Sequence, residues 1–284
     1  MKAPPFAYAR ARNLPEVFEL LEHYKDGAKI LAGGQSLMPA LNMRLSSPDL
    51  LIDISRLSEL AGIQVKGDHV HIGALTTHTQ IGDAAEIRKH LPLLADAVEH
   101  IAHPAIRNSG TFGGSLAMAD PAAEWPACCV ALDAQIVLAG KSGSRRIAAR
   151  EFFQGLYATA MKANEVLTEV VIPIPGADYR HVFLELARRR GDYAIVGVAA
   201  LAKVVNGSIS DLRLTFLGAS EKPVLAVKTS QAFVFKGFSE TVLKEAQQLL
   251  ADELDPSADL YSSAATKLHL ARVLTARAMK QLVA

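Results

Sequence analysis

The sequence has little of what nucleic-acid recognition requires. Among its 284 residues, 30 Lys and Arg balance 29 Asp and Glu to a net charge of +1, and only 6% of the residues are aromatic. A balanced charge leaves no basic footprint for a phosphate backbone, and few aromatic rings leave little for bases to stack on. We therefore expect no nucleic-acid partner.

Long apolar runs are also absent. No stretch reaches about 18 consecutive apolar residues, the length that spans a bilayer, so we expect no membrane span. The first ten residues, MKAPPFAYAR, contain no apolar core of a signal peptide. Together these features favour a cytoplasmic protein.

Cysteine occurs only twice, at Cys128 and Cys129. Adjacent thiols cannot join distant parts of a fold, and an iron–sulfur cluster typically takes four cysteine ligands. The chain therefore cannot hold such a cluster alone, and we expect both residues to be buried hydrophobes on a helix. His100 and His103 lack a third ligand at a suitable spacing, so we expect no metal site.

Familiar catalytic patterns are missing as well. The sequence has no P-loop, no G-x-G-x-x-G that opens a helix, no Ser-His-Asp arrangement and no paired acids at a motif-like spacing. We expect no catalytic side chain in this chain. Such a sequence is typical of a protein whose chemistry belongs to a cofactor.

Hydrophobic residues make up half of the chain, and their pattern divides it into three units of an α+β fold. Short strands alternate with helices in residues 1–56. Residues 57–177 begin with a hairpin and continue with helices and further strands. In residues 178–284, three strand-like runs with a short turn at 206–208 precede helical segments. This last pattern predicts a three-stranded antiparallel sheet and a helical bundle.

Two short stretches combine paired glycines with hydroxyl side chains: AGGQS at 32–36 and TFGGS at 111–115. Paired glycines allow positive φ angles and close approach to a ligand, and successive free N–H groups form a nest for an anion. Neither loop contains Lys or Arg, which suits a diphosphate held by backbone and hydroxyl dipoles. Two such nests predict a dinucleotide that lies between two lobes, although either glycine pair alone is also typical of a tight turn.

The two stretches also resemble a known family. Residues 28–45 and 101–127 are similar to the FAD-binding stretches of the medium, flavoprotein subunit of molybdenum hydroxylases. That family includes carbon monoxide dehydrogenase, xanthine dehydrogenase and the bacterial aldehyde and N-heterocycle dehydrogenases. Residues 164–175 are similar to the end of its flavin domain, and residues 188–200 to the start of its C-terminal domain.

The resemblance implies a two-lobed FAD-binding domain of the type shared with p-cresol methylhydroxylase-like flavoproteins, followed by a C-terminal domain. Nothing in the sequence marks a covalent flavin attachment, so we expect FAD to be bound non-covalently. The family's second motif usually reads T-I-G-G-N, and here Phe112 and Ser115 replace its second and fifth residues, with a donor kept at Ser115. The residues implied to bind FAD are Lys29, Ala32, Gly33, Gly34, Gln35, Ser36, Leu37, Ile101, Ala102, Gly110, Thr111, Gly113, Gly114, Ser115, Ala117, Asp120, Leu167 and Tyr193.

The same resemblance implies a role for each part of this set. Residues 32–36 and 111–115 would wrap the diphosphate from opposite lobes. Lys29 would lie at the adenosine end, and Asp120 would accept a hydrogen bond from a ribityl or ribose hydroxyl. From the residues alone, Lys29 could equally be a surface charge and Asp120 a cap for the turn that follows it.

The remaining roles concern the flavin ring. Ile101, Ala102 and Leu167 would line it, and Tyr193 would lie at its exposed edge. From the residues alone, Ile101 and Leu167 could instead be ordinary core, and Tyr193 an ordinary strand aromatic.

The resemblance further implies partners. They are a large subunit with a molybdopterin cofactor and a small subunit with [2Fe–2S] clusters, assembled as a dimer of heterotrimers. Electrons would pass through the clusters to FAD and on to an external acceptor. The alternative is a dinucleotide-binding regulatory module without redox chemistry. Carbon monoxide, an aldehyde and an N-heterocycle all remain open as substrates of the complex.

Overall fold

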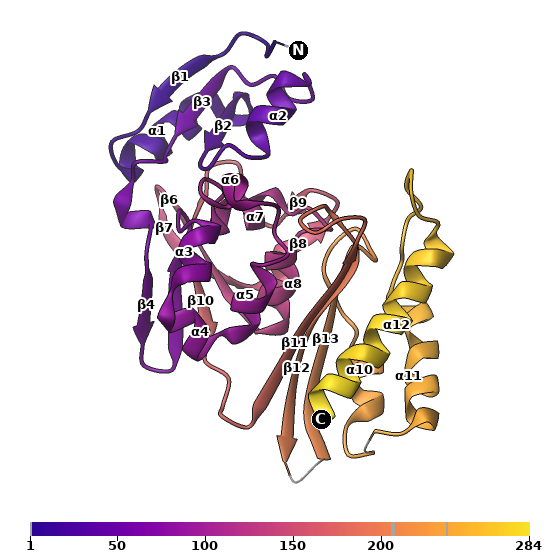
Figure 1. Cartoon of the computed structure of the whole chain (residues 1–284). Helices are drawn as coiled ribbons and strands as arrows, with labels where there is room; N and C mark the ends of the chain where they lie inside the picture. The colour runs from indigo at the N-terminus through magenta and orange to yellow at the C-terminus, as the bar shows by residue number, and fades with distance from the viewer. Residues whose placement is uncertain (1, 206–207, 237) are drawn as a thin grey trace.

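A computed structural model describes residues 2–205, 208–236 and 238–284. Figure 1 shows three bodies that follow one another along the chain. We call them the first lobe (β1 to β3), the second lobe (β4 to β10) and the C-terminal domain (β11 to α12).

The first lobe is a small parallel sheet in the order β1-β3-β2. Its first helix begins where the Asn13 side chain accepts a hydrogen bond from the Glu16 N–H, which supplies a partner for a donor that the helix itself leaves free. Val17 of this helix and Ile52 of the central strand are fully buried in one apolar cluster. The elements are β1 (Ala7–Arg10), α1 (Leu14–Tyr24), β2 (Ala28–Leu31), α2 (Leu37–Asn42) and β3 (Leu50–Asp53).

The second lobe contains an antiparallel sheet in the order β4-β5-β10-β6-β7, with helices packed beside it. A small hairpin, β8 and β9, extends from it toward the C-terminal domain (Figure 1). Its strands are β4 (Ile63–Lys66), β5 (His69–Gly73), β6 (Gln135–Gly140), β7 (Gly143–Ala148), β8 (Phe153–Gly155), β9 (Ala158–Thr159) and β10 (Val166–Pro173). Its helices are α3 (His78–Asp83), α4 (Ala85–His90), α5 (Pro92–Ala97), α6 (Pro104–Arg107), α7 (Phe112–Met118), α8 (Glu124–Ala131) and α9 (Ala149–Phe152).

The C-terminal domain is an antiparallel sheet covered on one face by helices (Figure 1). The three strands that the sequence predicted are present, and the two-residue β14 extends the sheet at its edge, so the described sheet has the order β11-β12-β13-β14. Two residues of the turn expected at 206–208 lie outside the described residues. The elements are β11 (Tyr179–Ala187), β12 (Ala194–Val205), β13 (Ser208–Leu217), β14 (Val224–Leu225), α10 (Val227–Phe233), α11 (Glu240–Glu253) and α12 (Ala264–Val283).

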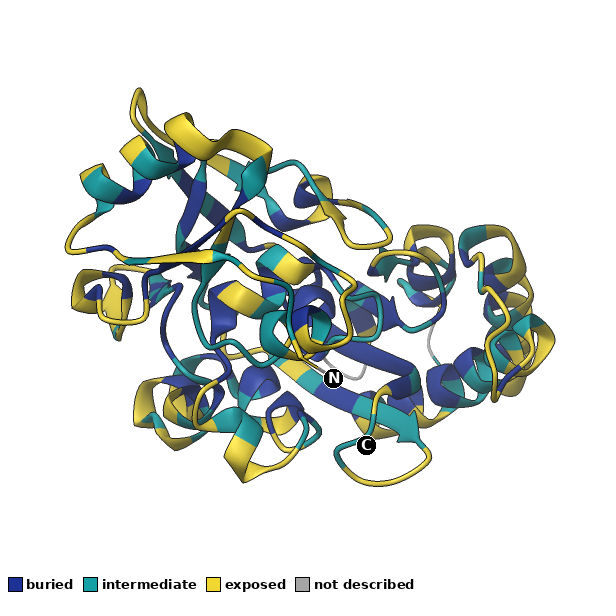
Figure 2. Cartoon of the chain, turned by 90° about the horizontal axis from the view of Figure 1, so that it is seen from above, coloured by how far each residue is buried: buried dark blue, intermediate teal, exposed yellow. Residues whose placement is uncertain are grey.

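The C-terminal sheet separates two apolar cores. On one face, Val182 and Val198 pack in a cluster with the helices α10 to α12. On the other face, Phe183 and Ala199 belong to the core of the second lobe. Figure 2 shows the buried strands between these layers and the exposed outer helices. The second lobe and the C-terminal domain therefore share one continuous core. Within the described residues, no helix is both long and apolar enough to cross a membrane.

Candidate functional site

The first glycine loop keeps several backbone N–H groups without an acceptor among the described residues. It joins the end of β2 to the start of α2, and Gly34 has a φ of 72°, a conformation that favours glycine. Among the described residues, none accepts a hydrogen bond from the N–H groups of residues 33–36. The Gln35 side chain folds back, and its Nε2 donates to the Gly33 carbonyl at 2.9 Å. A run of free N–H groups is a nest suited to an anion, as the sequence predicted.

The two glycine stretches lie against each other, although about 80 residues separate them. A Cβ on Gly33 would lie 2.0 Å from the Ser109 carbonyl oxygen and 3.0 Å from the Gly110 Cα. A Cβ on Gly114 would lie 3.9 Å from the Ala32 Cβ. Only glycine at position 33 allows the two lobes to meet this closely, so the fold brings both stretches to one place.

The second glycine stretch differs from the expected nest. Phe112 N–H donates to the Thr76 carbonyl at 2.9 Å, and Gly113 N–H donates to the Ala74 carbonyl at 2.8 Å. Gly114 N–H donates to the Thr111 hydroxyl oxygen at 3.1 Å, because Thr111 caps helix α7. The prediction of free donors and positive φ angles here is therefore wrong. Both glycines are helical: the Gly113 N–H ties α7 to the chain after β5, and the Gly114 N–H completes the Thr111 cap of the helix.

Gly113 owes its identity to packing rather than to a ligand. A Cβ there would lie 2.5 Å from the Ala74 Cβ, so glycine lets the start of α7 reach the chain that follows β5. What this stretch can offer a ligand is hydroxyl groups. Within the described part of the chain, neither the Thr111 nor the Ser115 hydroxyl donates to a protein group.

His78 and Trp125 support the second stretch, and sequence reasoning missed both. His78 N–H donates to the Gly110 carbonyl at 3.0 Å, and Trp125 Nε1 donates to His78 Nδ1 at 3.0 Å. Burial lowers the pKa of His78 to about 4, so its ring is neutral and can accept this bond. The only hint in the sequence was a histidine on an otherwise apolar helix face. That hint does not show which residue the histidine bonds to.

Asp120 caps a turn and still has a free oxygen. Its Oδ1 accepts a hydrogen bond from the Ala122 N–H at 2.9 Å, so the capping role that the sequence left open is real. No described residue donates to its Oδ2. Burial raises the pKa of Asp120, which shows that the carboxyl is withdrawn from water. The same side chain can therefore cap the turn and accept a ligand hydroxyl.

Tyr193 lies on a turn that packs against Ala102. Gly191 has a φ of 78°, and a Cβ on it would lie 2.3 Å from the Ala102 carbonyl oxygen. The Tyr193 side chain is 73% exposed, so it is not an ordinary core aromatic. Partial burial and the nearby charges of Asp120 and Glu124 raise its pKa.

Tyr157 is a neighbour that the sequence did not reveal. It has a φ of 53° in the turn between β8 and β9 and is 53% exposed. Its pKa is raised by partial burial and by Asp120 and Tyr193, which places the three side chains in one region. Two exposed tyrosines thus flank a withdrawn carboxyl at the junction of the second lobe and the C-terminal domain.

The other predicted residues are less directly placed for contact. Ile101 and Leu167 are buried in the second lobe's core, so each can offer a ligand only a small surface. Lys29 is exposed on β2, and Leu37 and Ala117 are half-buried on the helices that follow the two loops. Gly110 is buried, and a Cβ there would lie 2.7 Å from His78 Nε2, so packing alone requires glycine.

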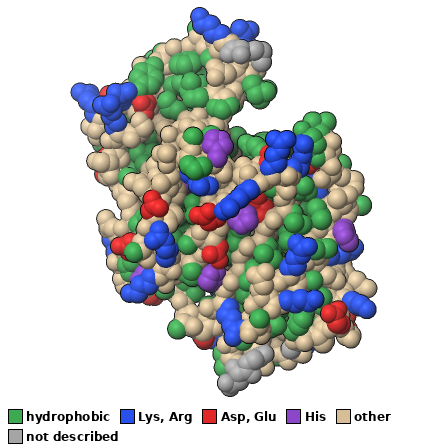
Figure 3. Space-filling view, in the orientation of Figure 1, with side chains coloured by type: hydrophobic (Ala, Val, Ile, Leu, Met, Phe, Trp, Pro, Cys, Tyr) green, Lys and Arg blue, Asp and Glu red, His purple; other side chains and the backbone are tan. Residues whose placement is uncertain are grey.

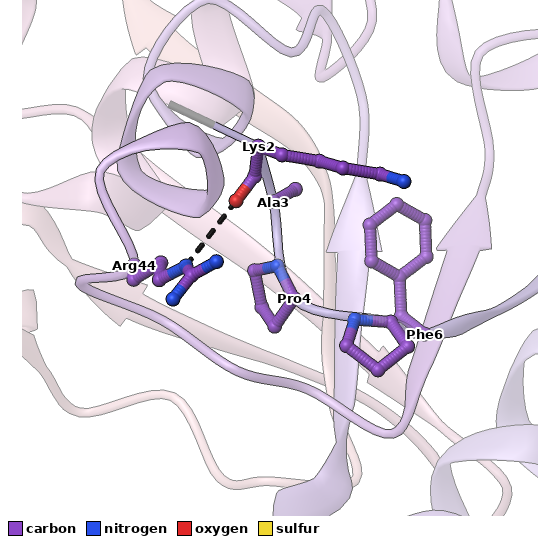
Figure 4. A pocket seen from close by; sticks show the side chains of 6 residues that line it. Lys2, Ala3, Pro4, Phe6 and Arg44 are labelled. Atoms are coloured by element: carbon purple, nitrogen blue, oxygen red, sulfur yellow. Dashed lines mark hydrogen bonds between the residues drawn. The ribbon is translucent and has the colours of Figure 1, made fainter.

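The surface is hollowed where the first lobe meets the rest of the molecule. Figure 3 shows this as a notch on the right-hand side beneath the upper lobe. A separate cavity of about 730 Å³ is lined by residues 2–6 and Arg44, whose Nε donates to the Lys2 carbonyl at 3.3 Å (Figure 4). None of the predicted FAD-binding residues lines that cavity. It therefore does not belong to the site that the glycine loops define.

Taken together, these features define a dinucleotide-binding protein of the two-lobed kind. Residues 4–175 match the family model described as the FAD binding domain in molybdopterin dehydrogenase. Residues 181–282 match the model described as the CO dehydrogenase flavoprotein C-terminal domain. The chain belongs to this family of FAD-carrying medium subunits, and the predicted fold class, FAD cofactor and oxidoreductase class are confirmed.

Individual relatives cover most of the chain. The glyceraldehyde dehydrogenase medium chain of Sulfolobus acidocaldarius is 34% identical over 281 residues, 99% of each chain. The nicotine 6-hydroxylase medium subunit of Paenarthrobacter nicotinovorans is 40% identical over 222 residues, 78% of this chain and 77% of that one. A solved structure of carbon monoxide dehydrogenase from Hydrogenophaga pseudoflava matches with a TM-score of 0.97 and 34% identity, covering 99% of this chain and 98% of that one.

Proposed function

We propose that residues 32–36 hold the diphosphate of FAD and that the second stretch completes the site through hydroxyl groups. The observation that carries this proposal is the row of free N–H groups at 33–36, pressed by Gly33 against the backbone of the second lobe. These donors fit a diphosphate, which offers acceptor oxygens and no donors. The hydroxyls of Thr111 and Ser115 lie on the facing stretch and can supply further donors.

Bound FAD supplies the redox chemistry of such a subunit, taking up electrons and passing them on. This chain's own residues bind and orient it. Asp120 accepts a hydroxyl of the ribityl chain or ribose through Oδ2, Ala102 backs the ring, and Tyr193 covers its exposed edge. The other predicted contacts remain part of this proposal, as do the domain limits 1–56, 57–177 and 178–284.

The names of the relatives support the assembly that we propose. Their titles describe medium chains and subunits of larger dehydrogenases. We propose that this chain joins a large molybdopterin subunit and a small iron–sulfur subunit in a dimer of heterotrimers, and that substrate is oxidised in the large subunit. We place the complex in the cytoplasm, because Cys128 and Cys129 are free and buried, as suits a reducing compartment.

Reconstitution with FAD tests the binding proposal. The chain should bind stoichiometric FAD, with flavin absorbance that dithionite bleaches, and should oxidise no aldehyde or heterocycle alone at ordinary enzyme rates of roughly 1–1000 per second. Binding of a dinucleotide that dithionite does not reduce would favour the regulatory alternative. Rapid turnover by the single chain would contradict the subunit proposal.

Two substitutions separate the roles of Asp120. Asp120→Asn keeps an oxygen that can accept from the Ala122 N–H, whereas Asp120→Ala removes it. Asp120→Asn should keep thermal stability while weakening FAD binding by about 1–3 kcal/mol, the scale for losing a charged hydrogen-bond partner. Asp120→Ala should lower both. If Asp120→Asn binds FAD as tightly as the native chain, the residue serves only the turn.

A further inference from the structure

Two glutamates lie in the interface between the second lobe and the C-terminal domain. Phe183 belongs to the core shared with the second lobe. Because side chains alternate along a strand, Glu185 of β11 faces the same way. It is paired in register with Gly197 of β12, which has no side chain to cover it. Its Oε2 is buried, and no hydrogen-bond partner exists for it among the described residues.

Glu124 reaches the same level of this interface from the other side. It is the first residue of α8, a helix that packs on β12 and β13, and only 9% of its surface is exposed. The turn before it is tied to the sheet, because Gly218 N–H donates to the Pro121 carbonyl at 2.8 Å. Gly218 directly follows Leu217, the register partner of Gly197. The topology therefore places both carboxyls in the same interface between the second lobe and the C-terminal sheet.

Neither carboxyl has a cation to balance its charge. In the described part of the chain, no Lys, Arg or His forms an ion pair with Glu124 or Glu185. Burial raises the pKa of Glu124 to about 7 and that of Glu185 to about 8, and the charge of Glu124 adds to the rise at Glu185. Two such groups cannot both be ionised cheaply, so one proton stays with them near neutral pH.

We propose that Glu124 and Glu185 keep one proton between them, as a coupled pair, and that this keeps the C-terminal sheet and the Tyr193 turn against the second lobe. Keeping one carboxyl protonated removes one of two charges from an apolar interface in which the buried Oε2 of Glu185 has no donor among the described residues. When the proton is lost, two carboxylates repel each other inside an apolar interface, and the contact loosens. Both residues are thus positioning residues for the Tyr193 turn. The consequence for a flavin edge rests on the proposed function, whereas the proton-sharing pair does not.

Other ionisable groups face the pair and have to be separated from it. Asp120 lies on the turn before α8, and Cys128 lies one helical turn after Glu124. On the α5 side are Asp96, which contacts His181 at 3.3 Å, and Glu99, which contacts Arg190 at 3.0 Å. His100 stacks on Phe183 at 5.1 Å, and Asp192 and Tyr193 lie on the β12 turn. Burial raises the pKa of Cys128 and lowers that of His100.

Trp125 provides the measurement, because it is the only tryptophan of the chain, is fully buried and directly follows Glu124. A charge that appears next to a buried indole shifts its emission, since charges act strongly at low dielectric. We expect the full-length chain, without added FAD, to show a reversible change in tryptophan emission between about pH 6 and 9, near the two raised carboxyl pKa values. Absence of this change would overturn the proposal, whatever the outcome with FAD.

Substitutions assign the change to the pair. Glu124→Gln/Glu185→Gln should abolish it, because amides of the same shape keep a donor and do not titrate. Glu185→Gln alone should remove the upper step and leave that of Glu124 in place, because the charge of Glu124 raises the pKa of Glu185 and not the reverse. Glu124→Gln should leave one step, moved to lower pH, since the repulsion at Glu185 is gone. His100→Gln is the matched control and should keep the native profile. Loss of the change in His100→Gln, or its survival in the double variant, would overturn the proposal.

Thermal stability gives a second readout that does not depend on fluorescence. Carboxyls with raised pKa values in the folded state stabilise it fully below their unfolded values, near pH 4.5, and this contribution is lost as pH rises through about 7 to 8. The native chain should therefore lose more Tm than the double variant between pH 6 and 9. Equal losses would contradict the pair. If the double variant does not fold, the same comparison with Glu185→Gln decides, because it should lose less Tm than the native chain over this range.

Discussion

The two glycine stretches look alike in sequence but differ in the structure: the backbone N–H groups of one lack acceptors in the described part of the chain, and those of the other have them. In the first, at 32–36, the N–H groups of residues 33–36 have no acceptor among the described residues. In the second, at 111–115, the backbone N–H groups donate to carbonyls of the second lobe and to the Thr111 hydroxyl that caps α7. A glycine pair thus marks a place where the backbone closely approaches either a ligand or another part of the protein.

The difference follows from what lies behind each loop. The first loop crosses from β2 to α2 at the edge of a small sheet, and although Gly33 packs against Ser109 and Gly110, no described group there accepts its N–H groups. The second opens a helix that must dock on the chain after β5, and Ala74 and Thr76 accept its first donors. Ligand binding through the backbone is therefore expected mainly from the first loop, and ligand binding through side chains from the second.

The largest effect is expected where the loops meet. Gly33→Ala would place a Cβ 2.0 Å from the Ser109 carbonyl oxygen, so the lobes would have to separate. Such overpacking costs up to about 3 kcal/mol, and FAD binding should weaken by roughly 100-fold. FAD titration followed by flavin fluorescence measures this. Gly155→Ala, where the nearest atom would be 3.7 Å away, is the control and should bind normally. Native affinity in Gly33→Ala would show that the site lies elsewhere.

Acid should weaken the second stretch next. The folded-state pKa of His78 is about 4, lowered from 6.5, so the neutral ring stabilises the fold above pH 6.5 and this contribution is lost as pH falls through about 4. The difference corresponds to roughly 3 kcal/mol. Urea unfolding at pH 7 and pH 4 should show this loss in the native chain and a smaller one in His78→Gln. Equal losses in both would mean that His78 does not govern the acid response.

A methyl group on the second glycine pair should affect folding more than FAD. Gly113→Ala would place its Cβ 2.5 Å from the Ala74 Cβ, which should lower the free energy of unfolding by about 1–3 kcal/mol. FAD affinity of the folded fraction should change by less than about threefold, because the Gly113 N–H already binds the Ala74 carbonyl. Unchanged stability together with loss of FAD binding would instead support the interpretation of residues 111–115 as an anion-binding nest.

The smallest effects should come from the two serines. Ser115→Ala removes a hydroxyl that the second stretch can direct at the diphosphate, so FAD binding should weaken by about 1 kcal/mol. Ser36→Ala should cost less, because free N–H groups surround it. Both variants should keep native Tm values. If Ser36→Ala weakened FAD binding more than Ser115→Ala, the proposal that the first stretch binds through its backbone and the second through side chains would be wrong.

The sequence was sufficient for the family, the fold class and the pairing of the glycine stretches. Strands and helices near the first loop follow from local patterns, such as Asn13 at the start of α1. The small β14 was missed because two residues carry no periodicity. Tyr157, Glu124 and Glu185 were missed for another reason. None of the three belongs to a recognisable motif in its own segment. Their possible roles become visible only because β8, α8 and β11 come together in the fold.

What the sequence determined by itself was where the backbone is bare: glycines at 33, 34, 113 and 114 allow close approach whatever surrounds them. Only the tertiary structure decided which group lies against each of these glycines. At Gly113 it is Ala74, because α7 must cover the second lobe's core. At residues 33–36 the second lobe packs against Gly33, yet no described group accepts the N–H groups. Hydrogen-bond partners are fixed by which segments meet in space, and that information is not local to any motif.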